Sequence, residues 1–357
     1  MMNEKERIEQ CLPLIVVWYQ QVRRPLPWRQ EPTPYHVWLS EIMLQQTRIE
    51  AAIPYYYRFL HRYPTVAALA QAEEEQLMKL WEGLGYYSRA RNLKKAAIQI
   101  MEHYGGQLPS QAAELKKLPG IGDYTAGAIA SIAYGQPEPA VDGNVLRVLA
   151  RLLASREDIA LAKTKAHITE LLRHSYPSGK EAALLTEGIM ELGETICIPN
   201  GETKCAACPL QAHCLACETG TVANYPVKSP PKERRVEQRT VLLLRHEGRY
   251  AIRKREEKGL LAGLWEFPNV LGKLSPAEAI AWAEAQGLTV TACTPCPTGK
   301  HVFTHVEWHM DAYLLDCAGE AGAFLWQSPQ EIKQNFSVPT AFRFCLKLIS
   351  GKAPEQK

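Results

Sequence analysis

The stretch Leu-Pro-Gly-Ile-Gly-Asp-Tyr-Thr-Ala, residues 118–126, places Gly120 and Gly122 between two helical segments. Glycine lets a backbone approach a partner closely, and the first N–H groups of the following helix have no partner within that helix. A DNA phosphate suits both features, and such a contact carries no base preference. We therefore interpret Gly120 and Gly122 as phosphate-binding positions. The same pattern taken alone is also that of an ordinary turn.

A second motif follows at residues 141–148, Val-Asp-Gly-Asn-Val-Leu-Arg-Val, where Asp142 precedes a helical pattern. Asp142 is in position to cap that helix, which would be a purely structural role. As a functional carboxylate at a helix N-terminus it would stay ionised and would stabilise positive charge growing on the anomeric carbon of a sugar. Both interpretations stay open from the sequence.

The ten cysteines of the chain are unevenly placed, and four of them form the pattern Cys197-x7-Cys205-x2-Cys208-x5-Cys214. Four thiolates in one short loop can close around a metal ion or an iron–sulfur cluster. A structural zinc and ordinary core cysteines are the alternatives. Zinc sites usually combine two Cys-x2-Cys pairs, and only one pair is present here. Cys217, a fifth nearby thiol, is left out because the three intervals already complete a site.

The length and the net charge of the chain limit the number of domains and the classes of protein to which it can belong. The 357 residues predict two or three domains, and the net charge of +3 excludes a histone-like basic protein and an acidic disordered chain. No apolar run reaches the roughly 18 residues of a membrane span, and the start Met-Met-Asn-Glu-Lys-Glu-Arg is not a signal peptide. We expect a cytoplasmic protein.

The hydrophobic period divides the chain into a helical part, residues 1–217, and an α+β part, residues 236–352, joined by a Pro-rich linker, residues 218–235. In the first part apolar residues recur at helical spacing from Tyr35, and Pro54 is expected after the end of that helix. Further helices are predicted at 66–83, 88–104, 124–134, 143–154, 164–174 and 180–195. In the second part we predict a hairpin of residues 239–245 and 250–255, a helix at 276–286 and a strand at 306–315.

Three features in one order, residues 118–126, 141–148 and 197–214, resemble the helix-hairpin-helix DNA glycosylases that carry a 4Fe–4S cluster. Leu26-Pro-Trp-Arg29, the stretch Val37–Arg48 and the stretch Trp81–Arg91 narrow the resemblance to the adenine DNA glycosylases of the MutY type. The resemblance implies an all-α catalytic region, with a six-helix barrel and an iron–sulfur subdomain, followed by a Nudix-like domain that recognises 8-oxoguanine.

The resemblance also implies a reaction, the removal of adenine mispaired with 8-oxoguanine or guanine. Glu41 would protonate the adenine at N7 and Asp142 would stabilise the oxocarbenium-like sugar, electrostatically or by transient attachment. Related bifunctional glycosylases carry a Schiff-base lysine where this chain has Tyr124. We therefore predict a monofunctional enzyme, in which Tyr124 and Asn144 line the pocket and position Asp142 or the water. A solvated helix glutamate is the alternative for Glu41.

Further site residues follow from the same resemblance. Gln46 and Tyr86 would fill or wedge the DNA helix where the adenine is flipped out. Trp28 and Tyr86, taken without their motifs, are also typical core aromatics. The 8-oxoguanine would be read by Phe303, Thr304 and His305, where the family has Phe-Ser-His, and a hydroxyl in a simple turn is the alternative for Thr304. The adenine pocket would be formed by Arg24, Trp28, Leu44 and Glu187.

The chain departs from the expected patterns in three further places. The first cysteine interval has seven residues instead of six, and its loop, Ile198–Lys204, has Lys204 opposed by Glu202. Thr186 stands where an amide is expected. The segment Ala279–Leu288 keeps only Glu284 of the carboxylates that hold Mg²⁺ in Nudix hydrolases, so we expect no nucleotide hydrolysis.

The sequence therefore predicts a monomeric bacterial enzyme that works at the nucleoid, with a 4Fe–4S cluster as cofactor and double-stranded DNA containing A:8-oxoguanine mispairs as partner. Two alternatives remain open. One is a related glycosylase with shifted mispair specificity, suggested by Thr304 and the altered cysteine loop. The other is a non-catalytic iron–sulfur DNA-binding protein, which the presence of both Glu41 and Asp142 disfavours.

Overall fold

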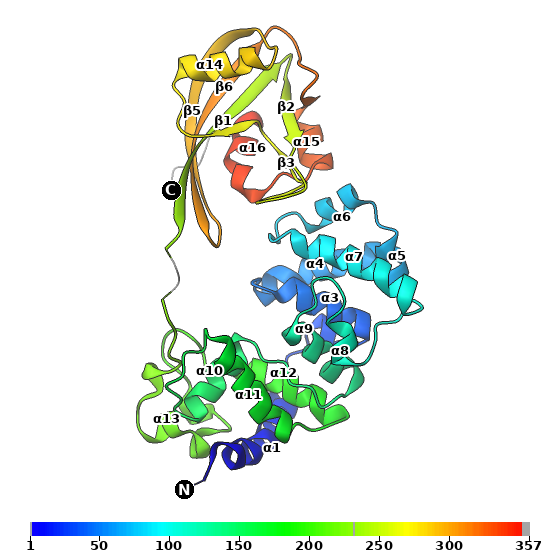
Figure 1. Ribbon diagram of the computed structural model, residues 1–357, viewed down its shortest axis with the longest axis vertical. Coiled ribbons are helices and arrows are strands. Elements are labelled where there is room, and N and C mark those ends of the chain that lie inside the picture. Colours follow the sequence, from blue (N-terminus) through cyan, green and yellow to red (C-terminus); the bar gives the residue numbers. More distant parts are fainter. Residues whose placement is uncertain (1, 231–232, 352–357) are drawn as a thin grey trace. The chain divides into compact units, whose positions relative to one another are not determined.

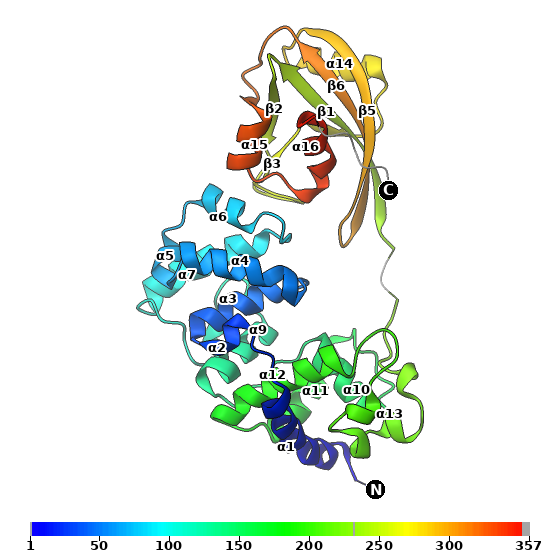
Figure 2. The same cartoon turned by 180° about the vertical axis from the view of Figure 1, so that it is seen from behind.

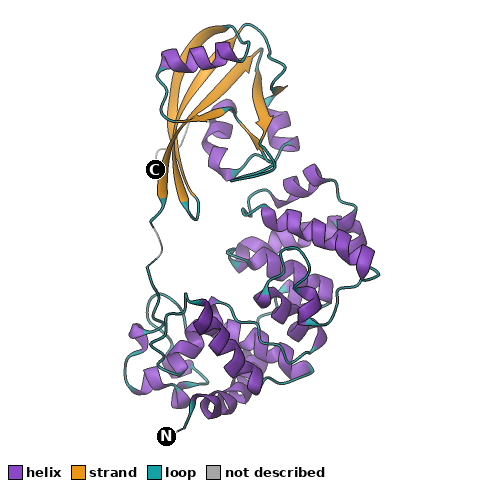
Figure 3. Cartoon of the chain, in the orientation of Figure 1, coloured by secondary structure: helices purple, strands orange, loops and turns teal. Residues whose placement is uncertain are grey.

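The computed structural model describes residues 2–230 and 233–351, and the chain divides into two compact units. The first unit consists of Met1–Ala72 and Arg91–Pro230, and the second of Glu73–Ala90 and Pro231–Lys357. In the described residues all strands lie at or beyond Arg235, as Figure 3 shows. The domain boundaries predicted from the sequence place Glu73–Ala90 in the helical part, whereas in the structure this segment groups with the C-terminal residues.

Among the described residues, thirteen α-helices precede the first strand, and Figure 1 labels most of them. They are α1 Glu4–Val22, α2 Pro27–Gln30, α3 Pro34–Leu44, α4 Ile49–Arg62, α5 Val66–Ala70, α6 Glu74–Trp81, α7 Ser88–His103, α8 Ala112–Leu115, α9 Asp123–Ala128, α10 Gly143–Leu152, α11 Ala162–His174, α12 Lys180–Thr195 and α13 Leu215–Glu218. A π-helical turn, η1 Ile129–Ala133, extends α9, and three short 3₁₀ turns are η2 Cys205–Ala207, η3 Gln211–His213 and η4 Val222–Asn224.

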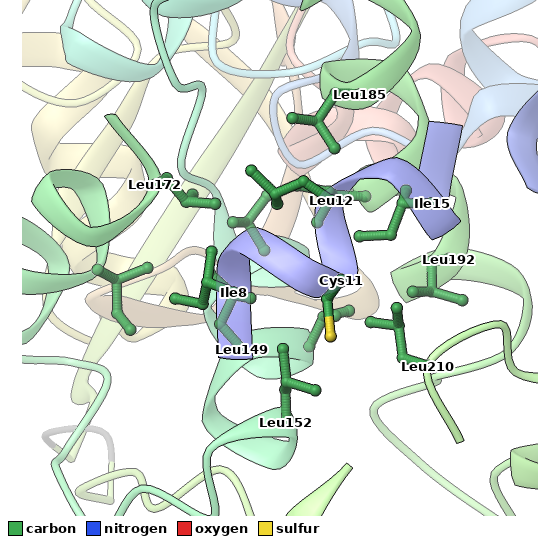
Figure 4. Packing of buried hydrophobic residues seen from close by; sticks show 14 of the residues in the cluster. Ile8, Cys11, Leu12, Ile15, Leu149, Leu152, Leu172, Leu185, Leu192 and Leu210 are labelled. Atoms are coloured by element: carbon green, nitrogen blue, oxygen red, sulfur yellow. The ribbon is translucent and has the colours of Figure 1, made fainter. Parts of the chain in front are cut away.

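The core of the first unit forms around α1. Ile8, Cys11, Leu12 and Ile15 recur at the i, i+3, i+4, i+7 spacing of one helix face, and all four are buried. They pack against leucines of α10, α11 and α12, as Figure 4 shows. Burial of each such side chain contributes about 1.5–3 kcal/mol. This cluster supports α10 and α12, which carry the functional residues described below.

Two helix predictions need correction. The helix that contains Tyr35 ends at Leu44, and Pro54 lies inside the next helix, α4. Pro54 lies in the second turn of α4, where it removes the hydrogen bond to the carbonyl of Glu50 and its ring crowds that carbonyl, so the helix continues through a proline at some cost. The predicted helix over 66–83 is two helices, α5 and α6, because the chain leaves the helical conformation after Gln71 and restarts at the cap residue Glu73.

The second unit is built on one mixed sheet with the strand order β3-β2-β1-β6-β5, in which β4 also pairs with β1 and β7 with β2. β1 and β6 run parallel from Arg235↔Val306 to Arg245↔Asp316, and the other pairs are antiparallel. The predicted hairpin, strand and helix are confirmed as β1–β2, β6 and α14. The elements are β1 Arg235–His246, β2 Arg249–Lys254, β3 Trp265–Glu266, β4 Asn269–Leu271, α14 Pro276–Ala285, β5 Val290–Val302, β6 Val306–Cys317, β7 Leu325–Gln327, α15 Pro329–Asn335, η5 Thr340–Phe342 and α16 Arg343–Ile349.

Both faces of this sheet are covered. Val241 and Leu243 of β1 point into a core with residues of α15 and α16, whereas Leu242 and Leu244 point into a second core with α14. Figure 2 shows α14 on the opposite side of the sheet from α16. A strand buried on both faces reads as a continuous apolar run instead of an alternating one, which explains the run at residues 241–244.

In the described residues no helix is both long enough and apolar enough to cross a membrane.

Candidate active site

The helices of the first unit enclose a cavity of about 400 Å³. It collects residues from segments that are far apart in the sequence, namely the α1–α2 region, α3, α9, α10 and α12. Eight of the residues singled out in the sequence line it: Arg24, Trp28, Glu41, Leu44, Tyr124, Asp142, Asn144 and Glu187. The carboxylates predicted for catalysis therefore share one cavity with the side chains predicted to hold the base.

Glu41 lies on the buried side of α3 and is only 7% exposed. The hydroxyl of Tyr124 donates a hydrogen bond of 2.6 Å to its Oε2. Burial raises the pKa of Glu41 to about 7, the bond from Tyr124 opposes the rise, and the nearby charges of Asp142 and Glu187 add to it. Burial also holds the pKa of Tyr124 well above its usual value, so the phenol keeps its proton. Glu41 thus carries a proton in part of the molecules at neutral pH, unlike a solvated helix glutamate.

Asp142 is the N-cap of α10, so the capping interpretation is confirmed. Its Oδ1 accepts from the backbone N–H of Val145 at 2.8 Å, and its Oδ2 accepts from Nδ2 of Asn144 at 2.9 Å. Because Asp142 also lines the cavity, the structural and the functional interpretation do not exclude each other. Burial raises the pKa of Asp142, while the hydrogen bonds from Val145 and Asn144 lower it, so the expectation that Asp142 stays ionised remains a prediction.

Two glycines let the segments around Asp142 approach closely. A Cβ on Gly127 of α9 would lie 2.4 Å from the carbonyl oxygen of Pro139, just before Asp142 in the chain. A Cβ on Gly193 of α12 would lie 2.7 Å from the Cβ of Asn144. Neither approach is possible with a side chain present. These glycines therefore fix the distance from α9 and α12 to the start of α10.

Carboxylates of α12 and arginines of the α1–α2 region form a charged network beside the cavity. Glu187 accepts from the hydroxyl of Tyr19 at 2.9 Å, and Glu191 is paired with Arg29 at 2.9 Å and with Arg24. The sequence-based site omitted Arg29 and Glu191. The sequence does carry a signal for Glu191. Glu187, Glu191 and Glu194 recur at four- and three-residue steps, so they share one face of a helix. Carboxylates are seldom buried without partners, so such a face indicates a charged site when it is buried.

Trp28 and Leu44 form the apolar side of the cavity. Trp28 is buried and packs edge-to-face against Tyr56 with ring centroids 5.5 Å apart. It is therefore a core aromatic and a cavity wall at the same time.

The structure places the other predicted residues outside this cavity. Gln46 and Tyr86 have backbone φ angles of +57° and +47°, which non-glycine residues rarely adopt. Tyr86 is 46% exposed, so the core-aromatic alternative is wrong for it. In the second unit Thr304 and His305 are exposed in the turn between β5 and β6, whereas the ring of Phe303 packs on Trp308 at 4.9 Å.

The two glycines of the hairpin motif differ in their surroundings. Gly120 has φ +79°, and a Cβ there would lie 2.8 Å from the Cβ of Asn92. Gly122 caps α9, and a Cβ on it would meet nothing within 4 Å. Gly120 is thus required by the turn itself, while Gly122 leaves the N-terminus of α9 open. The phosphate-binding role of both stays a prediction.

The four cysteines of the motif lie beside the core of the first unit. Cys197, Cys208 and Cys214 pack against that core, and Nη1 of Arg151 donates to Sγ of Cys197 at 3.2 Å. Burial raises the pKa of the Cys208 thiol to about 12, and the neighbouring thiols of Cys197, Cys214 and Cys205 add to the rise. None of the ten cysteines forms a disulfide, and the described residues contain no group of three or more side chains in a metal-binding arrangement.

Thr186, where an amide was expected, belongs to a buried hydroxyl network. Its Oγ1 donates to Ser131 at 2.8 Å and lies 2.7 Å from the hydroxyl of Tyr176. The departure therefore has a structural role in joining α12 to η1.

Comparison with known proteins agrees with this geometry. Residues 39–174 match the HhH-GPD superfamily base excision DNA repair protein model, and residues 239–348 match the NUDIX domain model. A thermostable thymine-DNA glycosylase superposes with a TM-score of 0.55 at 27% identity, covering 60% of this chain and 97% of that one. A non-covalent endonuclease III–DNA complex gives a TM-score of 0.52 at 25% identity, covering 62% and 99%. Fold and cavity thus define a base excision DNA glycosylase of the helix-hairpin-helix superfamily.

The curated relatives narrow this class. The adenine DNA glycosylase of Buchnera aphidicola subsp. Acyrthosiphon pisum is 33% identical over 306 residues, which cover 85% of this chain and 85% of that protein. The human adenine DNA glycosylase is 31% identical over 408 residues, covering 95% of this chain and 74% of that protein. The chain belongs to the adenine DNA glycosylase family. Its fold, a helix-hairpin-helix domain followed by a Nudix-like domain, is the one expected from the sequence.

Proposed function

We propose that this enzyme hydrolyses the N-glycosidic bond of adenine mispaired with 8-oxoguanine or guanine. The observation that carries the proposal is a buried carboxyl with a pKa of about 7, Glu41, in the same cavity as a second, hydrogen-bonded carboxylate, Asp142. Two carboxyl groups with separate environments are what protonation of a leaving group and stabilisation of a sugar cation require.

The reaction follows from these two environments. Glu41 delivers its proton to N7 of the flipped adenine, and the electron pair of the C1′–N9 bond moves into the base as the bond breaks. The sugar becomes an oxocarbenium-like cation, which the negative charge of Asp142 stabilises. Water adds to C1′ and gives its proton to the carboxylate of Glu41, which restores the acid and leaves an abasic site and free adenine. Tyr124 holds Glu41 through its 2.6 Å hydrogen bond, and Asn144 holds Asp142.

The enzyme is monofunctional in this proposal. Strand cleavage through a Schiff base needs an amine near C1′. The side chains that line the cavity in the described part of the chain include arginines but no lysine. The phenol of Tyr124 stands at the lysine position of the hairpin motif and stays protonated.

Recognition divides between the two units. Arg24, Trp28, Leu44 and Glu187 surround the flipped adenine. Gln46 and Tyr86 occupy the gap left in the DNA helix, since an amide hydrogen-bonds with base edges and an aromatic ring stacks on bases. Phe303, Thr304 and His305 read the 8-oxoguanine. The exposure of Tyr86, Thr304 and His305 supports these roles.

Cys197, Cys205, Cys208 and Cys214 hold a 4Fe–4S cluster in our proposal. Three of these thiols pack against the core cluster, and the Cys208 thiol is influenced by the other three, which suits four soft ligands around one cluster. Such a cluster supplies a rigid covalent centre for the loop. Arg151 and Arg147 fix the first ligand, since they donate to Sγ and to the carbonyl of Cys197.

The partner is double-stranded DNA with an A:8-oxoguanine mispair, with Gly120 and Gly122 at a phosphate, and the enzyme acts as a monomer at the bacterial nucleoid. The endonuclease III neighbour was solved with DNA, which supports the partner class.

The test uses three duplexes, carrying A opposite 8-oxoguanine, A opposite G, and an oxidised pyrimidine, each analysed with and without alkali. We expect adenine release from the first two and strand scission only after alkali. Asp142→Asn should abolish excision while lesion binding remains. Scission without alkali contradicts the monofunctional reaction, and a different preferred mispair supports the shifted-specificity alternative. Binding without excision on every duplex supports the non-catalytic iron–sulfur protein.

A further inference from the structure

Helix α6 and the loop after α15 contact each other within the second unit through one lysine. Nζ of Lys79 lies 2.5 Å from the carbonyl oxygen of Lys333, 2.9 Å from that of Phe336 and 2.7 Å from Oε2 of Glu82. An ammonium group has three N–H donors, so all of them have partners. Lys79 thus joins a segment from the helical part of the sequence to the Nudix-like domain.

The acceptors explain why a cation is placed there. The last carbonyls of a helix have no partner within that helix and carry partial negative charge. Lys333 is in the last turn of α15, and Phe336 follows its end. The ammonium of Lys79 therefore satisfies carbonyl groups that α15 itself leaves unpaired.

Glu82 completes the contact from the other side. Its Oε1 accepts from the backbone N–H of Val338 at 3.1 Å, while Oε2 binds Lys79. The side chains of Lys79 and Glu82 are only 24% and 29% exposed, so water and salt screen this pair less than a surface ion pair. We refer to Lys79 and Glu82, with the segment Lys333–Val338 at the C-terminal end of α15, as the Lys79–Glu82 clamp.

Helix α6 leads directly from the clamp to Tyr86. Arg89 makes the intervening turn rigid, because its Nη2 donates to the carbonyls of Leu84 at 3.0 Å and Gly85 at 3.1 Å. Its guanidinium carbon also lies 5.6 Å from the centre of the Tyr86 ring. Together with the positive φ of Tyr86, these contacts fix the direction of the ring relative to α6.

The hydroxyl of Tyr86 lies 3.0 Å from Oγ1 of Thr304. Thr304 is in the β5–β6 turn, and Phe303, its neighbour, packs against the same core as Val338 of the clamp. One rigid path therefore runs from α15 through Lys79, Glu82 and α6 to Tyr86, and a second runs from α15 through the domain core to Thr304. The two paths meet at the two hydroxyl groups.

We propose that Lys79 and Glu82 are positioning residues that hold Tyr86 opposite Thr304 and thereby set the preference for 8-oxoguanine over guanine opposite adenine. This proposal rests on the proposed function, since it assigns Tyr86 and Thr304 to the lesion. The clamp touches neither base. It acts by keeping the two side chains that do so at a fixed distance.

The test compares Lys79→Met with Lys333→Met. Both variants remove one positive charge. The side chain of Lys79 is part of the clamp, whereas Lys333 contributes only its backbone carbonyl and its side chain is exposed. The excision rate constant and the duplex affinity are measured for A opposite 8-oxoguanine and A opposite G. For Lys79→Met we expect the ratio of the two affinities to fall about tenfold, the size of losing charge-assisted hydrogen bonds, and for Lys333→Met to stay as in the unchanged enzyme.

Two further variants separate positioning from a general loss of structure. Lys79→Arg keeps a charged donor and should restore most of the ratio, whereas Glu82→Gln should lower it. Hydrogen exchange at residues 333–338 should quicken in Lys79→Met and not in Lys333→Met. An equal fall of both affinities, or an unchanged ratio with quickened exchange, overturns the proposal. If the unchanged enzyme excises adenine from neither duplex, it is the proposed function that fails, and exchange still reports on the clamp.

Discussion

The ionisation of Glu41 gives the proposed reaction a pH dependence. The pKa of Glu41 is raised to about 7, chiefly by burial, and the proposed reaction uses its protonated form. We expect the single-turnover rate constant to be level below pH 7 and to fall by about tenfold per pH unit above it. The raised pKa also means that Glu41 contributes stability that is present below its ordinary pKa and is lost as the pH rises through 7. A rate that stays level to pH 9 would show that Glu41 is not the acid.

Tyr124 provides an independent check on the same group. Its hydrogen bond favours the charged form of Glu41 and lowers the pKa of that carboxyl. In Tyr124→Phe the pKa should rise, so the falling limb of the pH profile should move up by about one to two pH units. Tyr134→Phe is the matched control, because that hydroxyl donates to the carbonyl of Leu108 and not to Glu41. A limb that moves down, or moves equally in the control, would contradict the assigned hydrogen bond.

Single residues also show what sequence alone could predict. Glu41, Asp142 and Tyr124 were found because each lies in a long motif, and the cavity brings them together. Arg29 and Glu191 were missed as a pair because they come from separate helices and meet only in the folded chain. The burial that raises the pKa of Asp142 could not be predicted, since a cap is visible in a sequence but the extent of burial is not.

At the scale of elements, the close approach of α9 to the segment before Asp142 should be disrupted by adding a single methyl group. In Gly127→Ala the new Cβ would meet the carbonyl oxygen of Pro139 at 2.4 Å, so α9 or the segment before Asp142 must move. We expect a loss of about 1–3 kcal/mol in the free energy of unfolding, despite the better helix propensity of alanine, and slower excision. Gly322→Ala, where a Cβ meets nothing within 4 Å, should change neither quantity. An unaltered unfolding midpoint for Gly127→Ala would show that the approach is not needed.

The cysteine loop is a second element with a clear outcome. Cys208→Ala should give protein that lacks the visible absorbance, iron and sulfide of a 4Fe–4S cluster and has a lower melting temperature, because the loop packs on the core through Cys197, Cys208 and Cys214. Cys217→Ala should keep about four irons per chain, since Cys217 is not one of the proposed ligands. Equal loss of iron in both variants would mean that the ligand set is wrongly assigned.

Elements also show where pattern reading fails for physical reasons. β5 is not among the predicted strands, and it contains Pro295 and Pro297, which disfavour a strand. It is an edge strand, where a missing N–H need not break the sheet. The pairing of β5 with β6 also shifts in register between Cys296 and Gly299, and Pro297 lies within this irregular segment. The prediction of a single helix over 66–83 was wrong because the amphipathic period of the sequence continues across the break at Gln71–Glu73.

At the scale of the whole molecule, the net charge is only +3, so we expect DNA binding to depend on the local charge at the binding surface more than on the total charge. DNA binding by phosphate contacts releases counterions, so we expect the logarithm of the affinity to fall linearly with the logarithm of the salt concentration. Excision at saturating enzyme should depend on salt much less, because Glu41 is buried away from the ions. Titrations of one duplex from low to high salt measure both. A salt-independent affinity would contradict binding through phosphates.

The packing of α1 has a consequence for how the chain is made. Tyr19 bonds to Glu187, 168 residues later, and the apolar face of α1 rests on α10, α11 and α12. A ribosome that adds about 5–20 residues per second therefore releases this helix many seconds before its partners exist. During that time the stripe of Ile8, Cys11, Leu12 and Ile15 faces solvent. Within the first unit, α1 thus waits for partners that follow it in the chain, and the nascent chain offers chaperones a binding site that the folded unit does not have.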